Sequence, residues 1–355
     1  MPLGLRYPII HQRGLLTSAR RAVPRRQPLP PLTFPRNPPP PSSRTMSSAP
    51  PQLPALPEVT RLAPGCIRIL AGNPGKFTLQ GTNTYLVGTG PWRWLIDTGE
   101  GKPSWLANLR RVLAEEGPGT ALAGVLLTHW HRDHVGGVAD VLREWPGTAV
   151  FKRRRADADG EEAGEAGWKT MDIADGQRFN VPGASLTAAH TPGHTTDHTV
   201  FVWEEEGALF TGDNVLGHGT SVFEDLSEYL GSLERMRGLY RGKGAGKAYP
   251  GHGAVVEDGP GKIAEYLRHR QMREDQVVQT LSEGTREEGM TVMEVVRVMY
   301  KDVPENLHPA AAHGVMQIVA KLQKEGKAVA VESKEEEEEE RWKLKEPASP
   351  GKSAL

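Results

Sequence analysis

The sequence has a single cysteine, Cys66, among its 355 residues. One cysteine cannot form an internal disulfide, so no feature of the chain indicates an oxidising compartment, and we expect an intracellular protein. Cys66 precedes the run Ile67–Leu70, whose apolar residues alternate as in a β-strand. We therefore expect a packed thiol at this position and not a nucleophile.

Long hydrophobic runs are also absent. No stretch approaches the roughly 18 to 20 apolar residues that a helix needs to cross a bilayer, so we expect a soluble protein without a membrane span. Hydrophobic residues make up 37% and charged residues 25% of the chain, which is typical of a globular protein. The 29 prolines and 40 glycines are unevenly distributed, and this predicts disorder at the two ends.

Acidic residues are missing from residues 1–57, which contain eight arginines and no Asp, Glu or Lys. Removing these eight positive charges from the net charge of −1 leaves −9 for residues 58–355. The opening resembles a mitochondrial transit peptide, although Pro38–Pro41 exclude a helix beyond roughly the first 20 residues. The alternatives are an untargeted disordered extension and a protein that starts at Met46. We therefore expect the mitochondrial matrix or the cytoplasm.

From Val59 to about Val331 the pattern predicts an ordered α/β region. The expected strands are residues 67–70, 84–87, 94–96, 123–127, 148–151, 186–188, 199–203 and 208–210; the expected helices are 103–115, 135–145, 262–283, 291–299 and 310–325. Residues 153–176 are expected to form a loop. A strand pair within 327–332 would complete a winged helix with the last three helices.

The expected organisation has four parts. They are an extension over residues 1–57, a main domain over 58–260, a winged-helix-like domain over 261–331 and a disordered charged tail over 332–355. The tail contains the run Glu335–Glu340, whose like charges repel one another.

Four potential metal ligands lie within six residues, at the end of an apolar strand: His129, His131, Asp133 and His134. Imidazole and carboxylate groups are ligands that zinc prefers. In a turn at a strand end, His129 and His131 can point to one side while Asp133 and His134 point to a second position. This one loop can therefore serve two metal ions.

Three more strand ends repeat the arrangement with His194, Asp213 and His252, each beside glycine or proline. Such residues fix tight turns that let a ligand reach inward. One histidine alone is weak evidence for a metal site, but seven ligands in this arrangement predict one.

The H-x-H-x-D-H run, followed by a single His, a single Asp and a final His, resembles the metallo-β-lactamase superfamily over roughly residues 59–260. The resemblance implies a four-layer αβ/βα sandwich with two Zn²⁺ ions. It further implies that one zinc is held by His129, His131 and His194, the other by Asp133, His134 and His252, and that Asp213 bridges them. Asp97 would support the metal loops without being a ligand.

Such a site predicts hydrolysis. Water shared by two cations has a pKa of about 7 instead of about 16, and can attack a carbonyl carbon or a phosphorus atom. Both cations can also stabilise the developing oxyanion. Asp133 is the candidate catalytic residue that orients this water and passes its proton to the leaving group. Among the other histidines, His198 and His218 are candidates for hydrogen bonds within the site.

Longer runs resemble the β-lactamase-like protein 2 group over residues 59 to about 331, including Gly81–Val87, Leu95–Gly99, Gly212–Thr220 and Tyr300–His308. The resemblance implies two possible activities. Animal members are mitochondrial endoribonucleases that act on single-stranded RNA, and fungal members include thioesterases that release a polyketide from an acyl carrier protein. Residues Lys76–Gln80 and Asn214 are closer to the fungal branch of atrochrysone carboxyl thioesterases, which favours thioester hydrolysis.

Charge does not decide between the two substrates. The acidic body disfavours a broad RNA-binding surface, because affinity for nucleic acid depends on phosphate neutralisation, yet carrier proteins are also acidic. The basic run Lys152–Arg155 fits either partner or a solvated loop face. A third hypothesis is a binding protein with a winged helix and a vestigial metal site, which the complete ligand set disfavours.

Overall fold

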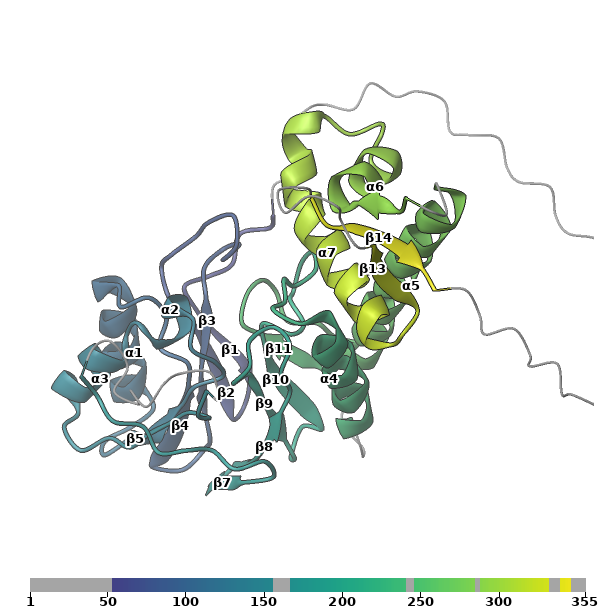
Figure 1. Ribbon diagram of the computed structural model, residues 1–355. Coiled ribbons are helices and arrows are strands. Elements are labelled where there is room, and N and C mark those ends of the chain that lie inside the picture. The colour runs from purple at the N-terminus through teal and green to yellow at the C-terminus, as the bar shows by residue number, and fades with distance from the viewer. Residues whose placement is uncertain (1–52, 156–166, 241–245, 285–287, 332–338, 346–355) are drawn as a thin grey trace, which may run out of the picture. The chain divides into compact units, whose positions relative to one another are not determined.

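The computed structural model describes residues 53–155, 167–240, 246–284, 288–331 and 339–345 (Figure 1). The transit-like opening and most of the run Glu335–Glu340 therefore lie outside the described residues. No helix in the described part of the chain is long and apolar enough to cross a membrane.

The main domain contains two β-sheets. The first has the strand order β1-β2-β3-β4-β5-β6, with β1 Val59–Ala63, β2 Cys66–Leu70, β3 Asn83–Val87, β4 Trp92–Ile96, β5 Ala121–Leu126 and β6 Val150–Phe151. The second has the order β11-β10-β9-β8-β7, with β7 Arg178–Val181, β8 Ala184–His190, β9 Thr199–Trp203, β10 Ala208–Gly212 and β11 Ala248–Pro250. Cys66 is fully buried on β2, and this burial raises the pKa of its thiol, as a packed residue requires.

Three apolar clusters separate four layers. Inward-facing residues of both sheets, such as Tyr85 on β3 and Phe201 on β9, form the middle cluster. The outer face of the first sheet packs on α1 (Pro103–Glu115) and α3 (Val138–Glu144). The outer face of the second sheet packs on α4 (Leu226–Leu239) and α5 (Gly259–Glu283). The expected αβ/βα sandwich is confirmed (Figure 1).

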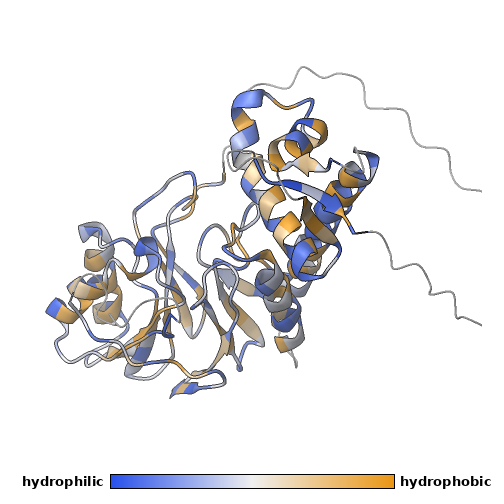
Figure 2. Cartoon of the chain, viewed as in Figure 1, coloured by the Kyte–Doolittle hydropathy of each residue, from blue (hydrophilic) through white to orange (hydrophobic). Residues whose placement is uncertain are grey.

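Helix α1 shows how the sequence specifies this layering. Pro103 occupies its first turn, where a missing N–H costs nothing. Trp105, Leu109 and Val112 recur at helical spacing and are buried against the first sheet. Hydrophobic and hydrophilic residues alternate along the helices in this way (Figure 2).

A winged helix follows at the C-terminal end. Its elements are β12 Met290–Thr291, α6 Val292–Met299, η1 Glu305–Leu307, α7 His308–Lys324, β13 Ala328–Val331 and β14 Arg341–Leu344. Helix α6 begins with a capping box, in which Thr291 and Glu294 satisfy each other's backbone N–H groups. Residues of α6 and α7 share one core cluster with α4 and α5. The expected winged helix is therefore confirmed.

Several elements differ from the sequence predictions. The strand pair expected within residues 327–332 is wrong, because β13 pairs with β14, which lies in the segment expected to be a disordered tail. Trp342 on β14 is buried, which accounts for its order. The helix expected over residues 135–145 is divided into α2 (Arg132–Val135) and α3, and helix α4 was not predicted.

Candidate metal centre

The predicted ligands all follow strand ends at one edge of the two sheets. β4 and β5 run parallel, so the segment after β5 that carries His129 emerges beside Asp97. His194 follows β8, Asp213 follows β10, and His252 follows β11, which runs parallel to β10. Backbone bonds join the sheets at this edge, from Thr199 N to Thr128 O at 2.8 Å and from Asn83 N to Gly251 O at 2.7 Å.

Glycines in these turns allow the ligands to approach closely. A Cβ atom at Gly251 would clash with Oδ1 of Asp213. Gly193, which precedes His194, has φ = +121° and packs against the backbone of Tyr229 at the start of α4. Any larger residue would displace a ligand at either position.

The first group of ligand atoms comprises His129, His131, His194 and Asp213. Nδ1 of His131 lies 2.9 Å from Nε2 of His129 and 3.1 Å from Nε2 of His194. Oδ2 of Asp213 lies 3.7 Å from Nε2 of His194. Three imidazole nitrogens and a carboxylate therefore surround one point.

The second group comprises Asp133, His134 and His252. Nε2 of His252 lies 3.3 Å from Nε2 of His134 and 3.2 Å from Oδ2 of Asp133. Asp213 lies beside this group too, with Oδ1 3.4 Å from Nε2 of His134 and Oδ2 3.2 Å from Nε2 of His252. Asp213 is thus the one residue of the seven whose carboxylate contacts both groups.

The two groups differ in electrostatics. In the first, burial lowers the pKa of His129 well below its ordinary value and that of His131 to about 4, and neighbouring histidines add to the effect. Both imidazoles are therefore neutral near pH 7, which is the form that binds metals.

In the second group, burial alone would lower the pKa of His134 and His252. The carboxylate of Asp213 and its acidic neighbours outweigh burial, so the pKa of His252 rises to about 9 and that of His134 rises well above its ordinary value. Burial would likewise raise the pKa of Asp133 and Asp213, but the histidines beside them lower it. This half of the site is rich in negative charge that only a proton or a cation can balance.

The donor set fits metal ions. Ligand atoms around a tetrahedral zinc at about 2.0 Å lie roughly 3.3 Å apart, close to the spacings within both groups. In addition, Oδ1 of Asp213 is buried and accepts no hydrogen bond from the residues that the structure describes. Both groups are therefore suited to binding metal ions, as the sequence predicted.

Asp97 supports the site from behind. Its Oδ1 accepts a hydrogen bond from Thr128 N at 2.8 Å, and its Oδ2 accepts one from Thr128 Oγ1 at 2.8 Å. Oδ2 also lies 2.7 Å from Nδ1 of His134, so the Nδ1 proton points at Asp97 and Nε2 is left for a metal. Asp97 belongs to neither ligand group.

Asp97→Asn should weaken metal binding about 10- to 100-fold, the usual effect of losing an outer-shell partner. The amide keeps the shape of the side chain but cannot accept all three bonds, so the ring of His134 loses its fixed orientation. Competition with a chelator measures the affinity. Asp140→Asn is the control, because Asp140 on α3 pairs with Arg143 and belongs to neither group. Equal affinity in both variants would contradict this role.

His198 forms a hydrogen bond within the site, but as an acceptor and not as the predicted donor. Asp213 N donates to Nε2 of His198 at 3.1 Å, so the ring proton is on Nδ1, which lies 3.0 Å from Thr191 Oγ1. Burial lowers the pKa of His198 well below its ordinary value, which keeps the ring neutral. His198 therefore holds the backbone of Asp213, while His218 is exposed.

The basic run Lys152–Arg155 is partly paired. Lys152 donates to the fully buried carboxylate of Asp197 at 2.6 Å. The guanidinium of Arg155 stacks over Trp130 at 4.5 Å, and Trp130 packs in turn against the ring of His131. The run thus reinforces the ligand loop, which its sequence alone did not indicate.

Two family models match the chain. The model of the metallo-beta-lactamase superfamily covers residues 77–252, and that of the beta-lactamase associated winged helix domain covers residues 291–342. Relatives that are over 40% identical to this chain in the aligned region match most of its length. The chain belongs to the metallo-beta-lactamase superfamily. It is therefore a hydrolase of that superfamily, and all seven ligand candidates lie within the matched segment.

Three relatives illustrate the similarity. A protein of Aspergillus chevalieri named atrochrysone carboxyl ACP thioesterase is 46% identical over 274 residues, which cover 76% of this chain and 83% of the relative. The beta-lactamase-like protein 2 homolog of Drosophila melanogaster is 46% identical over 291 residues, covering 79% and 96%. A beta-lactamase domain protein from Burkholderia ambifaria, 18% identical with a TM-score of 0.66 over 83% and 96% of the two chains, shares the fold. The predicted membership of the β-lactamase-like protein 2 group is confirmed.

Proposed function

We propose that this member of the metallo-beta-lactamase superfamily is a thioesterase with two Zn²⁺ ions, which releases a polyketide acyl chain from an acyl carrier protein. The observation that chiefly supports this substrate is the 46% identity, over 83% of its length, to a relative named as an ACP thioesterase. Both ligand groups are complete in this chain, so the chemistry of a hydrolase is available to it.

In this proposal His129, His131 and His194 would hold one zinc, and Asp133, His134 and His252 would hold the other. Asp213, whose carboxylate lies beside both groups, would bind both. When bound, the two ions lower the pKa of a shared water toward about 7 and polarise the carbonyl oxygen of the substrate.

Asp133 is the proposed proton carrier. Of the two carboxylates among the ligand candidates, it is the more exposed, at 24% for its side chain against 11% for Asp213. Thr82 Oγ1 lies 3.3 Å from Oδ2 of Asp133 and orients the carboxylate. Asp133 would accept the proton of the attacking water and deliver it to the sulfur atom when the C–S bond breaks, so that the carrier leaves as a thiol.

The test compares two substrates with the same metal-loaded protein. An acyl thioester on a carrier protein and a labelled single-stranded RNA are each incubated with the wild type and with Asp133→Ala. The proposal is supported if the wild type releases the acyl group from the carrier protein and Asp133→Ala does not. Cleavage of RNA without thioester hydrolysis would refute it.

The alternative is an endoribonuclease that cleaves single-stranded RNA. The resemblance to the β-lactamase-like protein 2 group, whose animal members are such nucleases, favours it, as does the arginine-rich, acid-free composition of residues 1–57. The Drosophila melanogaster relative, which is 46% identical, carries the name of that group. The mitochondrial matrix would accompany this activity. A binding protein with a vestigial site is disfavoured, because all seven ligand candidates come together.

A further inference from the structure

The ring of His194 is held by a loop over residues 217–225, between Asp213 and α4. Nδ1 of His194 donates to the carbonyl oxygen of Val222 at 2.8 Å, which leaves Nε2 free to face His131. The loop also binds the residue before this histidine, because Glu224 N and Asp225 N both donate hydrogen bonds to Gly193 O, at 2.7 and 3.1 Å. The position of this loop therefore sets the orientation of a ligand candidate.

Helix α5 holds the loop through two hydrogen bonds, one of which Tyr266 donates from its hydroxyl to the carbonyl oxygen of Gly219 at 2.7 Å. Arg270 donates from Nη2 to the carbonyl oxygen of Ser221 at 2.7 Å, next to the carbonyl that His194 uses. Its guanidinium lies 4.7 Å from the ring of Phe223, which stacks on Tyr229 of α4. The same guanidinium lies 5.8 Å from the ring of Tyr229, so Arg270 contacts both stacked rings and holds Phe223 against α4.

Helix α7 of the winged helix contacts the end of the same loop. Lys324 pairs with Asp225 at 2.5 Å, and Asp225 is also the N-cap of α4. Gln317 Oε1 accepts from Leu226 N at 3.3 Å. These contacts tie the loop to the C-terminal part of the chain. Arg270 and His313 each contact a carbonyl oxygen next to that of Val222, at 2.7 and 3.4 Å, and the bond of Arg270 is the shorter.

We infer that Arg270 is a positioning residue for the metal centre, because it fixes loop 217–225 and the loop fixes the ring of His194. Helices α5 and α7 would then help to orient a metal ligand, in addition to forming the C-terminal part of the fold. This inference rests on the proposed role of His194 as a ligand. It is independent of whether the substrate is a thioester or RNA.

Arg270→Met should weaken binding of zinc at the first site several-fold, less than the roughly 10- to 100-fold typical of a group bonded directly to a ligand, because Arg270 acts through the loop. Methionine keeps much of the packing volume but cannot donate to Ser221 O. Zinc affinity of the full-length protein is measured by competition with a chelator, and the melting temperature of the zinc-free protein reports folding separately. Arg270→Lys retains a donor and should recover most of the affinity.

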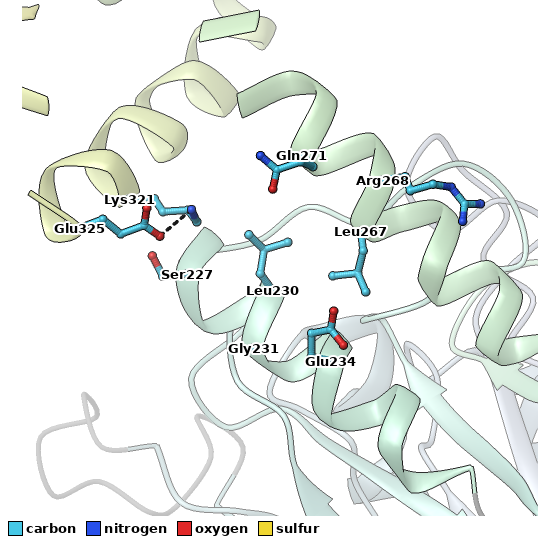
Figure 3. A pocket seen from close by; sticks show the side chains of 9 residues that line it. All are labelled: Ser227, Leu230, Gly231, Glu234, Leu267, Arg268, Gln271, Lys321 and Glu325. Atoms are coloured by element: carbon cyan, nitrogen blue, oxygen red, sulfur yellow. Dashed lines mark ion pairs between the residues drawn. The ribbon is translucent and has the colours of Figure 1, made fainter. Parts of the chain in front are cut away.

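Arg268→Met is the matched control on the same helix. Arg268 is one of the residues that line a pocket between α4, α5 and α7, and none of these lining residues belongs to loop 217–225 (Figure 3). Its loss should leave zinc affinity unchanged. Wild-type affinity in a folded Arg270→Met would overturn the inference. If that variant does not fold, Arg270→Gln decides instead: its shorter side chain should also lose the bond to the carbonyl oxygen of Ser221, so wild-type zinc affinity in folded Arg270→Gln would overturn the inference.

A double substitution separates positioning from general support. In a His194→Ala background, Arg270→Met should change zinc affinity by less than about twofold, because the residue through which Arg270 acts is gone. If the two losses simply multiply, Arg270 does not act through His194. Wild-type protein that binds no zinc would instead refute the proposed metal centre, and so the two failures are distinguishable.

Discussion

Asp133→Ala should lower kcat/KM by at least about 1000-fold, within the range for a proton-transfer group that also positions the reacting water. The substitution removes the carboxylate that lies 3.2 Å from Nε2 of His252 and is the most exposed acid of the ligand set. The first group retains His129, His131 and His194, so roughly one metal ion per chain should remain bound. Metal analysis and steady-state kinetics on one preparation measure both effects.

Two comparisons make this result specific. Asp140→Ala removes a carboxylate seven residues further along the chain that pairs with Arg143 and contacts neither ligand group. It should retain wild-type turnover and two metal ions. Asp213→Ala removes the carboxylate that touches both groups, so it should reduce binding at both sites. Unchanged turnover in Asp133→Ala would refute the proton-carrier role.

The seven ligand candidates were predictable because histidine and aspartate at strand ends carry a local signature. His129 and His131 alternate along an extended segment, and His194 and His252 each follow a glycine. The structure brings all seven into two adjacent groups. Strands such as Ile67–Leu70 were likewise predictable, since their apolar pattern is contained within four residues.

The residues behind the ligands were not predictable in their roles. His198 accepts from the backbone of Asp213, and Arg270 donates to the carbonyl oxygen of Ser221. Every residue has a backbone N–H or C=O group, so the sequence does not show which of them a side chain will bind. Both contacts also require the fold to bring separate segments of the chain together.

The errors in secondary structure have a related cause. Helix α4 contains Gly231 and Gly238, which lower its intrinsic helix propensity. It forms because Tyr229, Leu233 and Met236 are buried against the second sheet and α5, and because Asp225 caps it. Strand β14 follows an acidic run, and its partner β13 lies on the other side of that run. Tertiary contacts decided both elements.

Removing the metal ions should abolish hydrolysis and lower the melting temperature. Both groups are largely buried, and in the second the negative charge of Asp133 and Asp213 raises the pKa of His134 and His252, so protons must take the place of a removed metal ion. A metal ion present at 1000 times its Kd stabilises the folded chain by about 4 kcal/mol for each site, which corresponds to roughly 8–16 °C for a domain of this size. Dialysis against a chelator, followed by scanning calorimetry and activity measurements, tests this. Addition of Zn²⁺ should restore both properties, whereas Mg²⁺, which prefers oxygen ligands, should restore neither. Full activity in protein shown to be free of metal would contradict the two-zinc proposal.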